Sequence, residues 1–100
     1  MPSFAMSVPH QLPPDEALRR IQGLLGDLKQ QYGDQVSDLK ESWTGNDGEF
    51  SLTAMGLRLS GTLSVLPGEV KLNGNIPFAA VPFRGQIEQM IRERAETLLA

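Results

Sequence analysis

Two side chains in this sequence, Glu41 and His10, could take part in acid–base chemistry. Glu41 falls on a predicted strand at a position that faces the core, where a carboxyl group could act as a general acid or base. His10 follows another predicted strand and could pair with Asp15 or Glu16. Neither residue has a nucleophile at a recognisable spacing, and the sequence contains no hydrolase, phosphate-loop or dinucleotide motif. The sequence therefore favours a solvated role for Glu41, a structural role for His10, and a protein that is not an enzyme.

The composition argues against several other classes of function. The 100 residues include 9 Lys and Arg and 12 Asp and Glu, so a basic surface for nucleic acid is not expected. Because there is no Cys and only one His, neither a metal site nor a cofactor is expected. The sequence shows no signal-peptide pattern and no apolar run of about 18 residues that would span a membrane. We therefore expect a cytoplasmic protein.

Two glycines are predicted to face each other in the middle of an apolar sheet. Apolar and polar residues alternate over 57–65 and again over 70–78, which is the pattern of two strands with one buried face. If residues 66–69 form the turn between these strands, Gly61 pairs with Gly74. The two missing side chains would leave a dent in the core face.

The same register places two aromatic residues beside the glycines. A turn over 45–48 is expected to put Trp43 opposite Phe50, and Phe50 opposite Gly61. The resulting row, which ends at Gly74, could hold an apolar ligand. An aromatic ring over a glycine would instead fill the dent, and this simple packing is favoured over a cavity. The adjoining row is expected to contain Glu41, Leu52, Leu59 and Ile76.

Two segments with helical periodicity flank these strands. The first has apolar residues at steps of three and four over 14–32 and ends at Gly33. Gly23 and Gly26 fall on its solvent side, and the sequence gives no physical reason for either. The second helical pattern covers 83–99. Both helices would cover the apolar face of the sheet.

Together the elements predict one α+β domain over residues 1–100. With a first strand that ends at Pro9, the order is β-α-β-β-β-β-α. Pairing the first strand with the last gives a single curved five-stranded antiparallel sheet in the order 1-5-4-3-2, with two helices on one face. This is a reduced helix-grip arrangement, which is START-like. Charges on the edge strand 36–44, such as Lys40, discourage pairing with a second copy, so a monomer or weak dimer is expected.

The segment from Phe78 to Phe83 allows two interpretations. Its apolar side chains could form an exposed patch, with Phe78, Val81 and Phe83 as contacts to a partner. Alternatively, the segment packs on the core and guides the last helix onto the sheet. Core packing is favoured, because the helix-spaced residues after Phe83 need such a guide.

Several motifs, in this order, resemble the small polyhydroxyalkanoic acid system proteins of bacteria. They are VPH at 8–10, EAL at 16–18, YG at 32–33, SWTGNDGEF at 42–50, AMG at 54–56, GTLSV at 61–65 and PFAAVPFRGQIE at 77–88. The resemblance covers nearly the whole chain and implies a setting in the metabolism of polyhydroxyalkanoate, a hydrophobic polyester stored in cytoplasmic granules. It implies no catalytic or binding residues, because no molecular activity is established for that family.

Three hypotheses combine the residues with the resemblance. The first is a non-enzymatic accessory protein, cytoplasmic and granule-associated, that contacts the polyester surface or granule proteins through Phe78, Val81 and Phe83. The second is a small binder that holds an acyl or hydroxyacyl chain over the two paired glycines. The third is an enzyme of the same pathway that uses Glu41 or His10, and the absence of a catalytic motif disfavours it.

Overall fold

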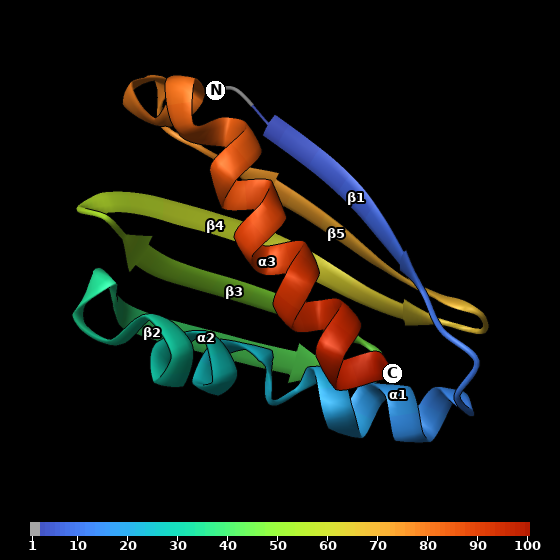
Figure 1. Cartoon of the computed structure of the whole chain (residues 1–100). Helices are drawn as coiled ribbons and strands as arrows, with labels where there is room; N and C mark the ends of the chain where they lie inside the picture. The colour runs from blue at the N-terminus through green and yellow to red at the C-terminus, as the bar shows by residue number, and fades with distance from the viewer. Residues whose placement is uncertain (1–2) are drawn as a thin grey trace.

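The computed structural model describes residues 3–100 as a five-stranded sheet with helices on one face (Figure 1). The elements in chain order are β1 (Ser3–Pro9), α1 (Pro14–Ile21), α2 (Leu24–Tyr32), the 3₁₀ turn η1 (Gly33–Gln35), β2 (Val36–Thr44), β3 (Asp47–Ala54), β4 (Leu57–Leu66), β5 (Glu69–Asn75), the 3₁₀ segment η2 (Phe78–Phe83) and α3 (Arg84–Leu99). The strands pair antiparallel in the order β1-β5-β4-β3-β2. The predicted fold class and strand order are confirmed.

The core lies between the concave face of the sheet and the helices. β1 shows the underlying pattern, because Phe4, Met6 and Val8 are buried while the residues between them are exposed. α3 crosses the concave face diagonally (Figure 1) and buries a stripe with a spacing of four residues. The members of this stripe are Ile87, Ile91, Ala95 and Leu99. The opposite face of the sheet carries mainly polar and charged side chains, such as Glu49, Thr62 and Lys71, which are exposed.

The β4–β5 hairpin has the register that the sequence predicted. Leu66 pairs with Glu69 across a short turn, in which Gly68 has a φ of 84°. Gly61 therefore pairs with Gly74. This pairing places the two residues that lack side chains next to each other in the middle of the sheet.

The first helical segment is broken, whereas the sequence predicted one helix over 14–32. α1 ends at Ile21, and Gly23 has φ −88° and ψ 0°, outside the helical region, before α2 begins. The Gly23 N–H donates to the carbonyl oxygen of Arg20 at 3.1 Å, which is a tightened last turn. Glycine costs about 1 kcal/mol in a helix interior relative to alanine, so the break falls where the helix is weakest.

Ion pairs fix the helices against one another. Arg94 of α3 donates from Nε and Nη2, along one edge of its guanidinium group, to the two carboxylate oxygens of Asp27 in α2, and the Nη2 hydrogen bond measures 3.1 Å. This hydrogen bond to Asp27 raises the pKa of Arg94. Arg20 of α1 donates to the carbonyl oxygen of Ala100 at 2.7 Å, and so joins α1 to the end of α3.

Both edges of the sheet carry features that hinder further strand pairing. At the β1 edge, Arg92 donates to the carbonyl oxygen of Ser7 at 3.2 Å, and Pro9 has no N–H to offer. At the β2 edge, the register shifts between Ser37 and Lys40 in a bulge. Asp38 lies in this bulge with a φ of 54°.

Candidate functional site

Aromatic rings fill the dent that the sequence predicted at the paired glycines. A Cβ atom built on Gly61 would lie 2.8 Å from Cζ of Phe50, and one built on Gly74 would overlap the ring of Phe4. Phe50 is 8% exposed and Phe4 is 3% exposed, so both rings belong to the core. A hollow of about 380 Å³ also borders the two glycines, but polar residues such as Thr62 contribute to its lining. A ligand held over the glycines on the core side would have to displace these rings.

Trp43 does not pair with Phe50, so that part of the predicted row is wrong. The β2–β3 turn contains only two residues, Gly45 and Asn46, because Thr44 already pairs with Asp47. A two-residue turn matches the twist of a hairpin better than the four-residue turn expected from 45–48. Trp43 consequently pairs with Gly48, and a Cβ atom on that glycine would lie 2.8 Å from the indole Cε3 atom.

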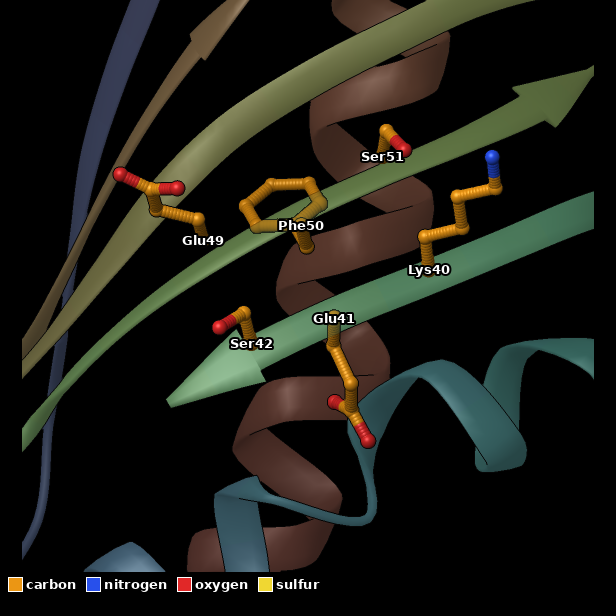
Figure 2. A pocket seen from close by; sticks show the side chains of 6 residues that line it. All are labelled: Lys40, Glu41, Ser42, Glu49, Phe50 and Ser51. Atoms are coloured by element: carbon orange, nitrogen blue, oxygen red, sulfur yellow. The ribbon is translucent and has the colours of Figure 1, made fainter. Parts of the chain in front are cut away.

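Glu41 takes the place opposite Phe50 that was expected for Trp43, and it is not in the row of Leu52 and Leu59. Figure 2 shows its side chain extending away from Phe50. Glu41 is exposed, and Trp43 Nε1 donates to its Oε2 at 3.3 Å. The surrounding hollow of about 290 Å³ is also lined by Lys40, Ser42, Glu49 and Ser51. Among the hydrogen bonds found in residues 3–100, no base–nucleophile pair forms here.

The buried His10 ring lies at one end of the sheet and bridges two backbone groups. Its Nε2 atom donates to the carbonyl oxygen of Leu66 at 2.9 Å, and its Nδ1 atom accepts the N–H of Leu12 at 3.1 Å. These partners require the tautomer with the proton on Nε2. Glu16, a possible partner from the sequence, instead accepts hydrogen bonds from Arg19 and from Arg20, which lower the pKa of its carboxyl group.

Four large hydrophobic side chains that are exposed gather at one end of the molecule, which we call the apolar end. Phe78 is 75% exposed, Phe83 46%, Val81 43% and Met55 42%. η2 and the β3–β4 turn, which carry them, lie at the same end of the sheet (Figure 1). Core packing, which the sequence favoured for the η2 residues, is wrong for Phe78, Val81 and Phe83. The tight 3₁₀ geometry buries Ala80 and leaves its bulkier neighbours outside.

Met55 was not identified from the sequence as a functional residue. It forms the two-residue β3–β4 turn with Gly56, and its φ of 53° is a left-handed conformation that Gly or Asn adopts more readily. Its side chain is exposed in spite of this cost. The sequence contained a signal that Met55 is unusual, because methionine occupies a position at which a tight hairpin turn favours asparagine.

A family model of polyhydroxyalkanoic acid system proteins matches residues 5–99 of the chain. The chain belongs to this family. No curated protein and no solved structure matches the chain, so the likeness to helix-grip and START-like folds stays a prediction. The description of the family states its link to the polyhydroxyalkanoic acid system and gives no molecular activity.

In this polyhydroxyalkanoic acid system protein, the two groups of predicted site residues differ in access to solvent. Phe78, Val81 and Phe83 are exposed to solvent, whereas Phe50 and Gly74 are buried. Residues 3–100 contain no group of three or more His, Cys, Asp or Glu side chains that could hold a metal ion. Over the same part of the chain, no helix combines the length and the apolar character needed to cross a membrane.

Proposed function

We propose that this protein is a non-enzymatic accessory protein of polyhydroxyalkanoate metabolism, and that it attaches to the granule through its apolar end. The observation that carries the proposal is the exposure of Phe78, at 75%, beside the half-exposed Val81 and Phe83. A cluster of exposed large apolar side chains typically marks a contact with another apolar surface. The family setting supplies such a surface, because the stored polyester is hydrophobic.

The apolar end can supply enough energy for reversible attachment. Full burial of a Phe side chain contributes about 1.5–3 kcal/mol, so the exposed part of Phe78 is worth about 1–2 kcal/mol. Val81 and Phe83 are each less than half exposed and together add about as much again. A total of about 3 kcal/mol corresponds to a roughly hundredfold preference for the surface over water. Arg84 and Glu88, which pair at 3.1 Å in the first turns of α3, stay hydrated beside the contact.

The test measures binding to bare polyester particles by sedimentation. A triple variant with Phe78→Ser, Val81→Ser and Phe83→Ser should lose most of the binding, because the substitutions remove the exposed apolar side chains. Leu66→Ser is the control, since Leu66 lies in the hairpin at the other end of the sheet (Figure 1). If the triple variant and the control bind as well as the unmodified protein, attachment through the apolar end is wrong.

The proposal includes granule proteins as the contact at the granule surface. Native granules keep their protein coat. If the partner is a granule protein, native granules should bind the unmodified protein and bare polyester particles should not. Loss of that binding in the triple variant would place the contact with the coat at the same apolar end. Recovery of the tagged protein solely in the soluble fraction of granule-forming cells would count against both versions.

A further inference from the structure

A surface groove beside the apolar end combines apolar and hydrogen-bonding groups. It has a volume of about 260 Å³. We call it the amide groove. α2 and η1 contribute Tyr32 and Gln35, and Met55 comes from the β3–β4 turn. The wall from α3 consists of Gln86, Gln89, Met90 and Glu93. Met55 belongs to both the groove and the apolar end, so the two features are continuous.

We propose that the amide groove binds a short neutral segment of a hydroxyacyl ester chain, such as the end of a polyester molecule. This inference rests on the proposed function, because attachment through the apolar end would bring the groove to the polyester. The volume lies just below the roughly 300 Å³ at which pockets for drug-sized ligands begin, which suits one or two ester units. The site differs from the one predicted over Gly61 and Gly74.

The hydrogen-bonding groups of the groove match those of an ester chain. Ester groups accept hydrogen bonds and donate none, and the side chains of Gln35, Gln86 and Tyr32 all carry donors. The thioethers of Met55 and Met90 offer adaptable apolar contacts for the alkyl parts between the ester groups. The groove therefore combines the two kinds of contact that such a chain needs.

The charge of the groove distinguishes an ester from an acid. Among the described residues that line it, Glu93 is the one that is charged at neutral pH. Its Oε1 atom accepts a hydrogen bond from Gln89 Nε2 at 2.8 Å, which fixes the carboxylate on the surface of α3. A fatty acid or an acyl thioester of coenzyme A would bring negative charge towards this carboxylate. A hydroxyl terminus of a hydroxyacyl chain could instead donate to it.

The backbone at Met55 gives independent support for a site. A methionine with a φ of 53° is strained, and strained residues gather where a contact requires them. Asparagine in the same turn would relieve the strain. Met55 lines the groove and offers it a longer and more apolar side chain than asparagine would. The turn therefore keeps a less stable residue that supplies an apolar wall.

The experiment follows the side-chain amide NMR signals of the glutamines while the methyl ester of a hydroxybutyrate trimer is added. We expect saturable shifts at Gln35, Gln86 and Gln89, and much smaller shifts with the free acid of the same trimer. Gln86→Ala should weaken binding about threefold to tenfold, which is the effect of one hydrogen bond. Gln30→Ala is the matched control, because Gln30 is exposed on α2 and does not line the groove.

Three outcomes would overturn the inference: no shift with the ester, equal shifts with ester and acid, or equal shifts with a peptide of the same length. The last outcome would assign the groove to a protein partner. The triple variant of the apolar end separates this inference from the proposed function. That variant should lose binding to particles and still bind the soluble trimer, because it leaves the glutamines in place. Particle binding by the unmodified protein without any trimer-induced shift would reject the groove and keep the proposed function.

Discussion

Gly74 should resist substitution by alanine because the ring of Phe4 occupies the space that a methyl group would need. A Cβ atom on Gly74 overlaps this ring, which is 3% exposed and packed in the core. Overpacking of this kind costs about 1–3 kcal/mol. Alanine in a strand recovers about 0.5–1 kcal/mol relative to glycine. We therefore expect Gly74→Ala to lower the free energy of unfolding by about 1–2 kcal/mol.

The opposed glycine should tolerate alanine less well. A Cβ atom on Gly61 would meet the backbone carbonyl oxygen of Asn73 as well as the ring of Phe50. A side chain can rotate away, whereas the backbone of β5 is held by β1 and β4 on either side. Gly61→Ala should therefore cost about 3 kcal/mol, at the upper end of the range for overpacking.

Urea unfolding of a double-mutant cycle tests this reasoning. In a Phe4→Leu background, Gly74→Ala should cost little, because leucine lacks the atoms of the ring edge. The two sites should be coupled by about 1–2 kcal/mol, above the roughly 0.5 kcal/mol scatter of independent sites. Gly26→Ala is the control, since a Cβ atom there meets nothing within 4 Å and should stabilise the helix. An equal cost of Gly74→Ala in both backgrounds would refute the assignment of the penalty to Phe4.

Three further predictions concern other parts of the fold. Hydrogen bonds from Arg19 and Arg20 lower the pKa of the Glu16 carboxyl group from its ordinary value of 4.5. The ionised carboxylate therefore stabilises the folded protein above pH 4.5, and this stabilisation is lost as the pH falls through the pKa that Glu16 has in the folded state. In urea unfolding at about pH 6 and pH 3, Glu16→Gln should therefore lose less stability on acidification than the unmodified protein. His10→Ala should lower the free energy of unfolding by about 2–3 kcal/mol, because it leaves two backbone groups without partners, and a change below about 0.5 kcal/mol would contradict this. Met55→Asn should raise the thermal midpoint through a gain of about 1 kcal/mol, and a lower midpoint would show that the turn is not strained.

Strict alternation and turn residues were sufficient to predict the strand order and the register of the β4–β5 hairpin. In β4 and β5 the apolar period has no interruption, and Leu66 and Glu69 flank a turn that contains proline and glycine, so the pairing of Gly61 with Gly74 followed from counting. The β2–β3 hairpin was harder, because Gly45, Asn46, Asp47 and Gly48 all tolerate turns and several loop lengths were compatible with them. Only the pairing of the strands decides between those lengths.

The candidate site was less accessible to sequence reasoning than the sheet. The η2 residues were expected to pack on the core and guide the last helix onto the sheet, but an apolar composition does not reveal which side chains a 3₁₀ segment leaves exposed. The amide groove brings Gln35, Met55 and Gln86 together from three separate elements. The periodicity of a single segment cannot predict that residues from separate elements lie close together. The break at Gly23 was missed although glycine weakens a helix, because Gly26 lies inside α2 without breaking it, so the presence of glycine alone does not locate the break.

The protected edges of the sheet have a consequence for the proposed attachment to a granule, because attached molecules would lie close to one another. Arg92 occupies a backbone acceptor along β1, and the bulge at Asp38 distorts the margin of β2. Molecules crowded side by side on a curved polyester would therefore resist fusing through their strands into fibres. Under the proposed function, such molecules would stay separate and could leave the surface one by one.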